Sequence, residues 1–209
     1  MLPPTIPLFP LPNVVLFPGV FLPLHIFEAR YRAMVADALK GDRIIGMTLL
    51  QPGFEADYNG RPPVYATGCA GLITHSEPLP DGRYDIVLRG MEKFRIIGED
   101  ASRSYRLAHI EAIPESLADA DRADVRARRR RLEAVLAATI ERSAGEPRFP
   151  PAVPDDDLVN ALAQYLDLEP IEKQALLEQP AVPARARALI ELLEMKLLSR
   201  HPSTSSLPN

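Results

Sequence analysis

The sequence has few of the features that mark disulfide-linked or membrane-spanning proteins. It contains one cysteine, Cys69. A single cysteine excludes an internal disulfide and any zinc site built from several cysteines. No segment approaches the ~18 consecutive apolar residues of a membrane-spanning helix. The prolines near the N-terminus also interrupt any stretch that resembles a secretory signal. These absences predict a cytoplasmic protein.

The charge balance is slightly acidic. The 28 Asp and Glu residues outnumber the 24 Lys and Arg residues, so the formal net charge is −4. Such a chain does not attract polyanions as a whole, which counts against nucleic acid as the main partner, although a local basic patch would revive that option. A length of 209 residues fits one large domain or two small ones.

Proline is abundant and concentrated at the start of the chain. Of the 22 prolines, seven lie within the first 23 residues, among Ile, Leu, Val and Phe. Disordered segments have low hydrophobicity, so this stretch is not typical of disorder. Proline lacks the N–H group that a central strand donates. We therefore expect short extended pieces, turns and sheet edges here.

Short apolar runs separated by turn residues continue to about Ile113 and predict a β-rich half. One helix interrupts them over residues 27–40, because its apolar residues recur at helical spacing and Gly41 is a natural terminator. Gly90 and Gly98 are expected to form bends between strands, or bulges. The expected strands span residues 5–8, 14–17, 20–25, 43–50, 65–75, 84–89, 93–97 and 105–113.

After Pro114 the pattern becomes helical. Asp155 is an expected N-cap and Pro170 an expected first-turn residue. The expected helices span residues 119–143, 155–166, 170–178 and 183–200, with a proline-rich connector at 145–154. The sequence thus predicts an α+β protein with a β-rich subdomain at 1–115, a helical subdomain at 116–200, and a disordered tail at 201–209.

No combination of reactive residues has the spacing that catalysis requires. The four histidines are scattered and lack metal-ligand spacing. Cys69 lies in an apolar run and is interpreted as a buried small hydrophobe. Residues 41–46 have the glycine spacing of a P-loop, but Met47 stands where the phosphate-binding lysine is required. Lys196 and Ser199 lie near a helix end, without the pocket that a Ser–Lys dyad needs. We expect no catalytic residue, no metal site and no cofactor.

The strongest basic run is five arginines between Arg126 and Arg131. Consecutive residues on a helix point about 100° apart, so these side chains spread around the helix. Acidic residues within one or two turns can pair with them. An ion-paired or solvated face is therefore favoured over an anion site.

Several ordered motifs resemble the N-terminal domain of Lon proteases. The most specific is the run from Pro7 to Gly19, PLFPLPNVVLFPG, which continues as LPLHIFE over residues 22–28 and RYR over residues 30–32. Residues 80–84, 88–90 and 94–96 of the β-rich half, and residues 172–178 and 184–187 of the helical half, are also similar to that family. The resemblance covers nearly the whole chain.

This resemblance implies a PUA-like β subdomain, built as a small barrel-like sheet with one helix, followed by a helical bundle. In Lon proteases this region helps to hold protein substrates, while an ATPase and a Ser–Lys protease domain lie downstream. The chain is expected to end where that ATPase would begin, as in stand-alone bacterial members. The resemblance therefore implies a non-catalytic polypeptide-binding module. The alternative is an RNA-binding protein that uses the PUA-like subdomain.

The implied partners are unfolded or extended polypeptide segments, and a separate protease or chaperone that works with the module. No membrane partner is expected. The sequence does not predict the oligomeric state. Candidate peptide-binding residues are polar or charged side chains inside the family-like motifs: His25, Arg30, Arg83 and Arg89. A purely structural role, in which they satisfy carbonyls or neighbouring carboxylates, stays open for each.

Overall fold

In the computed structural model of the chain, residues 1–54, 60–115, 119–139 and 153–200 are described. The expected tail at 201–209 and most of the expected connector at 145–154 lie outside this range. By their contacts, the residues group into two compact units: 1–115 with 160–178, and 116–159 with 179–209. The expected domain boundary near residue 115 stays a prediction.

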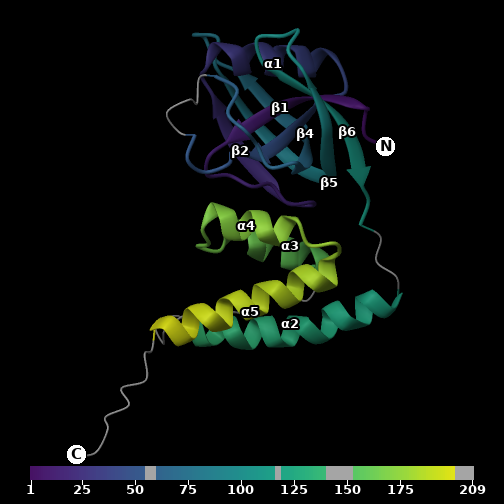
Figure 1. The fold of residues 1–209 in the computed structure, drawn as a ribbon, viewed down its shortest axis with the longest axis vertical. Coiled ribbons are helices and arrows are strands. Elements are labelled where there is room, and N and C mark those ends of the chain that lie inside the picture. The colour runs from purple at the N-terminus through teal and green to yellow at the C-terminus, as the bar shows by residue number, and fades with distance from the viewer. Residues whose placement is uncertain (55–59, 116–118, 140–152, 201–209) are drawn as a thin grey trace, which may run out of the picture. The chain divides into compact units, whose positions relative to one another are not determined.

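Six strands form one mixed sheet in the first unit (Figure 1). The strands are β1 (Thr5–Leu11), β2 (Phe21–Ile26), β3 (Ile44–Leu49), β4 (Thr67–Pro78), β5 (Tyr84–Asp100) and β6 (Arg106–Ile113). The order is β2-β5-β4-β3-β1-β6, and an additional β5–β6 pairing closes five of the strands into a ring. Among the described strands, only β1 and β3 pair in parallel. β2 lies outside the ring, against the first part of β5.

Strand β5 stays continuous through three register shifts in its pairings with β4 and β6. Residues Tyr84–Arg89 pair with β2, and Lys93–Asp100 pair with β6. In the pairing of β4 with β5 the shifts skip Met91 of β5 and Thr74 of β4, and in the pairing of β5 with β6 the shift skips Ile97. The bulge alternative for the Gly90 and Gly98 regions is therefore confirmed: one bent strand replaces the two that were expected.

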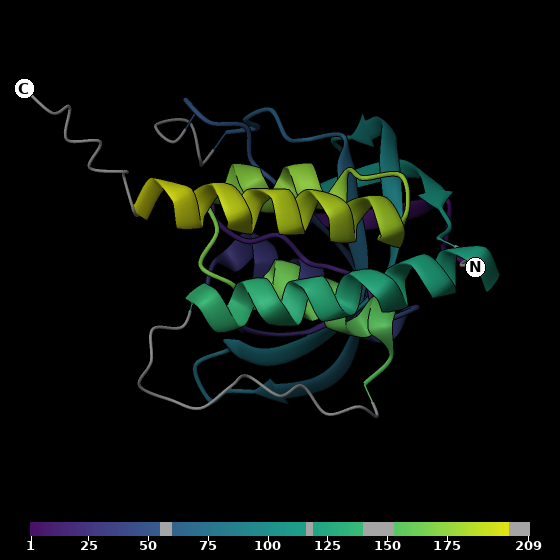
Figure 2. The ribbon, with the colours of Figure 1, turned by 90° about the horizontal axis from the view of Figure 1, so that it is seen from below.

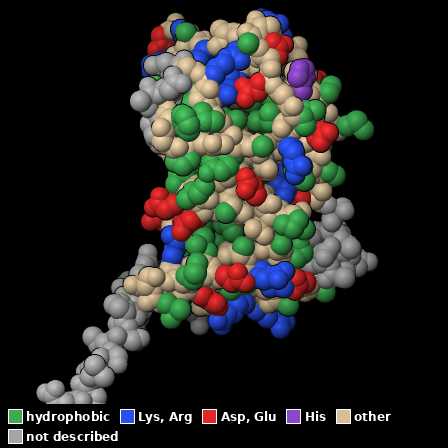
Figure 3. Space-filling model, viewed as in Figure 1, with side chains coloured by type: hydrophobic (Ala, Val, Ile, Leu, Met, Phe, Trp, Pro, Cys, Tyr) green, Lys and Arg blue, Asp and Glu red, His purple; other side chains and the backbone are tan. Residues whose placement is uncertain are grey.

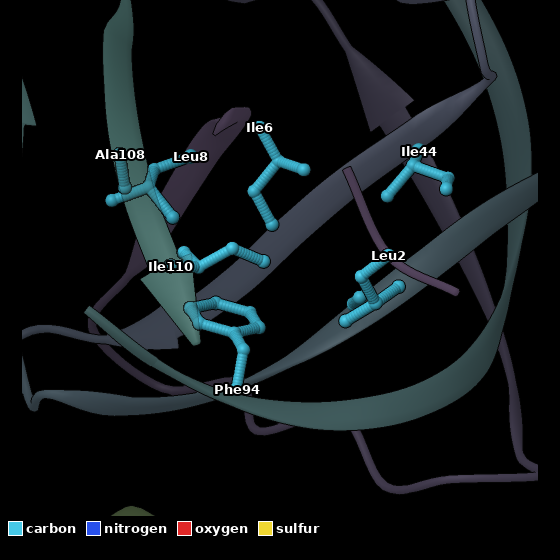
Figure 4. Packing of buried hydrophobic residues seen from close by; sticks show 8 residues of the cluster. Leu2, Ile6, Leu8, Ile44, Phe94, Ala108 and Ile110 are labelled. Atoms are coloured by element: carbon cyan, nitrogen blue, oxygen red, sulfur yellow. The ribbon is translucent and has the colours of Figure 1, made fainter. Parts of the chain in front are cut away.

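Alternation along the strands turns one set of apolar side chains into the interior of the ring. Figure 4 shows these side chains converging from β1, β3, β5 and β6. Ile6, Leu8 and Phe94 are almost completely buried. The cluster comprises Leu2, Ile6, Leu8, Ile44, Ala70, Phe94, Ala108 and Ile110.

The expected strand at 14–17 is wrong. Val15, Leu16 and Phe17 are buried but form no strand. The Phe17 N–H donates to Gln164 Oε1 at 3.2 Å, and the Phe17 carbonyl accepts from Val20 N at 3.3 Å. Gly90 lies so close that a Cβ atom there would fall 2.0 Å from the Phe17 oxygen. Side-chain and turn contacts thus replace strand pairing in this loop.

Helix α1 (Ala29–Lys40) lies across one end of the ring in Figure 1 and begins two residues later than expected. Its buried face packs beside β1, where the Phe9 and Tyr31 ring centroids are 4.4 Å apart. Helix α3 (Asp155–Tyr165) begins at the expected residue, and its residues 160–165 belong to the first unit. Helix α4 (Pro170–Leu177) starts at Pro170 with a Glu169–Glu172 capping box.

In the second unit, α2 (Asp119–Thr139) and α5 (Val182–Arg200) lie side by side in both Figure 1 and Figure 2. Val125, Leu132, Val135 and Leu136 of α2 are buried, as are Ala186, Leu189 and Leu193 of α5. An ion pair between Arg131 and Glu194 joins the two helices. No helix within the described ranges is long and apolar enough to cross a membrane.

Candidate functional site

The first unit contains an apolar pocket of about 440 Å³. It lies where β1 and β3 end and where α4 begins. Figure 3 shows hydrophobic side chains gathered on the face between the sheet and α4. We call this hollow the apolar pocket. It is lined by Pro12, Leu49, Leu50, Gln51, Pro52, Phe54, Tyr65, Pro170 and Ile171.

Backbone hydrogen bonds fix the sheet side of the apolar pocket. Leu50 N donates to Leu11 O at 3.0 Å, and Tyr65 N donates to Leu49 O at 2.9 Å. Gln51 binds the opposite segment twice, through its N–H to Pro63 O at 2.9 Å and through Nε2 to Val64 O at 3.1 Å. These polar groups are occupied within the protein, so the surface left for a ligand is mainly apolar.

Helix α4 is anchored to the β-rich half by a buried glutamine. Gln174 Nε2 donates to the Thr67 carbonyl at 3.0 Å and to Glu178 Oε1 at 2.9 Å. Lys173 Nζ donates to the Gln164 carbonyl at 2.7 Å, which ties α4 to α3. Burial lowers the Lys173 pKa below its ordinary value. The two anchors hold the Pro170–Ile171 wall of the apolar pocket in place.

A second pocket, of about 260 Å³, shares Leu50 with the first. Arg30, Arg61 and Arg106 line it together with Tyr31 and Tyr105, and we call it the arginine pocket. Arg30 was expected from the sequence as a binding residue. Arg61 and Arg106 were missed, because they lie in no family-like motif and meet Arg30 only through the fold.

Two of these three arginines have acidic partners. Arg30 donates through Nε to Glu28 Oε2 at 3.1 Å, and its guanidinium lies 4.6 Å from the Tyr31 ring centroid. Arg106 binds Glu99 through Nε at 2.8 Å and Nη2 at 3.0 Å, and binds the Pro62 carbonyl through Nη1 at 2.7 Å. Both guanidinium groups are thereby held in fixed positions along the pocket.

Two other predicted binding residues, His25 and Arg83, meet at the exposed ends of β2 and β5. His25 Nδ1 lies 2.6 Å from Asp85 Oδ1, and Arg83 Nη1 lies 3.1 Å from His25 Nε2. Arg83 can only donate, so His25 accepts at Nε2 and carries its proton on Nδ1, facing Asp85. A hydrogen bond from the Arg83 backbone N–H lowers the pKa of Asp81. The polar groups of His25 and Arg83 are thus hydrogen-bonded to neighbouring side chains at this end of the strands.

The fourth predicted residue, Arg89, lies apart from the other three. It is exposed on β5, in register with Phe21 of β2 and Leu72 of β4. The fold therefore brings His25 and Arg83 together, places Arg30 in the arginine pocket, and leaves Arg89 on the sheet surface. A peptide-binding role for these four residues stays a prediction.

The arginine run of α2 is largely neutralised by nearby carboxylates. Arg128 pairs with Asp124 at 2.9 Å, and Arg129 pairs with Glu133 at 3.1 Å and Asp155 at 2.9 Å. These two carboxylates raise the pKa of Arg129, and the larger cause is its hydrogen bond to Asp155. Arg131 pairs with Glu194. The favoured interpretation of an ion-paired face thus matches the observed contacts.

The described residues contain no group of three or more potential metal ligands. Cys69 is fully buried in β4. The segment with P-loop spacing ends helix α1 and enters strand β3, so it is not the strand-to-helix turn that binds phosphate. The Ser199 hydroxyl donates to the Met195 carbonyl at 3.0 Å, within its own helix.

Comparison with known proteins matches the chain to one domain of larger proteins. Residues 5–195 match the model of the family described as the ATP-dependent protease La (LON) substrate-binding domain. The chain is 28% identical over 203 residues to Lon protease 2 of Myxococcus xanthus, and 27% identical over 203 residues to the Lon protease of Anaeromyxobacter dehalogenans. Each match covers 93% of this chain and 24% of the relative. The chain thus spans about a quarter of the length of these proteases.

Solved structures share the fold. The N-terminal domain of Mycobacterium avium complex Lon protease superposes with a TM-score of 0.64 at 19% identity, covering 91% of this chain and 98% of that domain. A Lon N-terminal domain protein from Xanthomonas campestris has a TM-score of 0.57 at 24% identity, covering 91% of this chain and 97% of that one. The α+β class and the resemblance to Lon N-terminal domains are confirmed. The chain belongs to the Lon substrate-binding domain family.

Proposed function

We propose that the chain binds extended polypeptide segments in the apolar pocket and catalyses no reaction itself. The observation that carries the proposal is the pocket, whose volume of about 440 Å³ lies within the ~300–1,000 Å³ typical of ligand sites. Unfolded polypeptides expose large apolar side chains, and their transfer from water into such a pocket is favourable. A separate protease or chaperone stays a predicted partner.

The family match supports this proposal, because it covers the substrate-binding region and only 24% of the protease sequences. The RNA-binding alternative has less support. Nucleic-acid affinity comes mainly from several cations that face phosphates together. Among the described residues, the basic run of α2 is mostly ion-paired, and two arginines of the arginine pocket are also paired.

A charge placed in the apolar pocket tests the proposal. Ile171 lines the pocket and is 50% exposed, so Ile171→Glu should leave the fold intact while it disfavours an apolar guest. A fluorescein-labelled peptide with one Leu-Phe pair among Ser and Gly residues should bind the wild type saturably. We expect Ile171→Glu to weaken that binding about tenfold, which corresponds to losing most of one buried apolar side chain.

Ile97→Glu is the matched control. Ile97 is 59% exposed on β5 and does not line the apolar pocket, so the same substitution there should leave peptide affinity unchanged. Fluorescence anisotropy measures both variants, and thermal unfolding verifies that each is folded. Absence of saturable binding by the wild type, or equal weakening by both substitutions, would overturn the proposal.

A further inference from the structure

The arginine pocket adjoins the apolar pocket, and its charge is complementary to an acidic group. Leu50 lines both pockets. Pro12 lines the first and Pro10 the second, two residues apart along the same chain segment. Two residues of an extended chain span about 7 Å. A bound extended segment that places an apolar side chain in the first pocket therefore brings a neighbouring side chain within reach of the second.

We propose that the arginine pocket binds the carboxylate of an Asp or Glu that lies one to three residues from the apolar anchor of the bound polypeptide. This inference rests on the proposed function and narrows its substrate class. It predicts that acidic residues beside the anchor select among clients.

The charge count of the pocket favours a single carboxylate. Glu28 offsets Arg30, and Glu99 offsets Arg106. The Arg61 side chain is exposed, and among the described residues its guanidinium contacts the Asp100 carbonyl, with Nη1 to O at 3.5 Å. No close ion pair is described for Arg61; the Asp100 carboxylate, which accepts from the Ser102 N–H, attracts Arg61 only at longer range. Among the described residues, Arg61 is therefore the least compensated of the three arginines that line the pocket.

The two paired arginines still contribute to anion binding. Arg106 has a side chain that is only 11% exposed, and Glu99 and the Pro62 carbonyl hold its position. A guanidinium has five N–H donors, and the bonds described for Arg106 use three of its nitrogens once each. N–H groups that remain on its two terminal nitrogens are available to a carboxylate beside Arg61. Preorganised donors of this kind lose little conformational entropy on binding.

A carboxylate fits this site better than the phosphates of RNA. Phosphate-driven binding sums several contacts along a backbone, whereas this pocket has a volume of about 260 Å³ and, among the described residues, one arginine without a close ion pair. Its neighbour is an apolar pocket, which favours a partner that carries apolar and acidic side chains together. Polypeptides supply that combination.

A pair of isosteric peptides tests the inference with the full chain. Each labelled peptide carries the Leu-Phe anchor, followed two residues later by Glu in one and Gln in the other. We expect the wild type to bind the Glu peptide about fivefold more tightly at low salt, as is typical of a partly exposed charge-assisted contact. The ratio should approach one in ~1 M NaCl, because salt screens such contacts.

Arg61→Gln should abolish the preference for Glu and leave the affinity for the Gln peptide unchanged. Arg95→Gln is the control, since Arg95 is also exposed and lines neither pocket. Thermal unfolding verifies that both variants are folded. A preference that is lost in Arg61→Gln and kept in Arg95→Gln supports the inference.

The outcomes separate this inference from the proposed function. Equal affinity of the wild type for both peptides would overturn the inference while polypeptide binding stands. A preference for Glu that survives Arg61→Gln would also contradict it. Displacement of the Glu peptide by a short oligouridylate, dependent on Arg61, would identify a phosphate site instead. If neither peptide binds, the proposed function itself fails.

Discussion

At the scale of single residues, Tyr105, which immediately precedes β6, contacts α1 through its hydroxyl group. It donates to Asp37 Oδ2 at 2.9 Å, and the residue is 6% exposed. Burial, reinforced by the hydrogen bond to Asp37 and by the negative charge of that carboxylate, raises the Tyr105 pKa above its ordinary value of 10.0. The folded state therefore favours the neutral phenol more strongly than the unfolded state does.

This shift predicts a pH-dependent effect of Tyr105→Phe. Because the folded-state pKa is raised, the stabilisation is complete below the unfolded value of 10.0 and is lost as pH rises through the higher folded value. At about pH 8 we expect Tyr105→Phe to lower the free energy of unfolding by about 1 kcal/mol, the typical contribution of one hydrogen bond. Urea unfolding from about pH 8 to about pH 11 should show this difference shrinking. A constant or growing difference would contradict the assignment.

At the scale of elements, β2 lies at the edge of the sheet, and its sequence limits further pairing there. Among the described strands it pairs only with β5. The Phe21 carbonyl accepts from the Tyr165 hydroxyl at 2.7 Å, so it points away from β5. Backbone groups alternate along a strand, so Pro23 and His25 face the same outer edge. Proline has no N–H, and the edge therefore lacks its central donor.

Restoring that donor should promote association between copies of the chain. Pro23→Thr supplies an N–H at the middle of the outer edge of β2, and we expect the self-association constant to rise about fivefold, equivalent to about one additional hydrogen bond. Pro114→Thr is the control, since Pro114 is an exposed proline that follows β6. Sedimentation equilibrium measures both. Equal association constants for the two variants would show that Pro23 does not protect this edge.

The same elements show how far local patterns reach. Apolar alternation and turn residues predicted most of the strands, and Pro170 marked the start of α4, because these signals act within a few residues. The buried run Val15–Phe17 misled the prediction, because an apolar run does not reveal whether its backbone groups bond to a strand or to a side chain such as Gln164. That choice is made by residues that lie far away in the sequence.

At the scale of the whole molecule, local sequence patterns likewise do not predict which distant residues come together in the site. The family-like motifs pointed to Arg30, but the apolar pocket joins Pro12, Leu49 and Phe54 to Ile171, more than a hundred residues later. Residues 160–178 group with the β-rich half, although they lie within the range expected to form the helical subdomain. No periodicity within a single segment carries that information, because it arises from long-range packing.

The proposed site therefore predicts protection from hydrogen exchange in segments that are distant in sequence. Saturating Leu-Phe peptide should slow amide exchange together at residues 49–54 and at Ile171, since both segments line the apolar pocket. Slowing of about tenfold is expected where binding opposes local opening by about 1.4 kcal/mol. Mass spectrometry of the full chain measures the exchange, and Ile171→Glu should abolish the joint protection. Protection confined to α2 and α5 would place the peptide elsewhere and contradict the apolar pocket as its site.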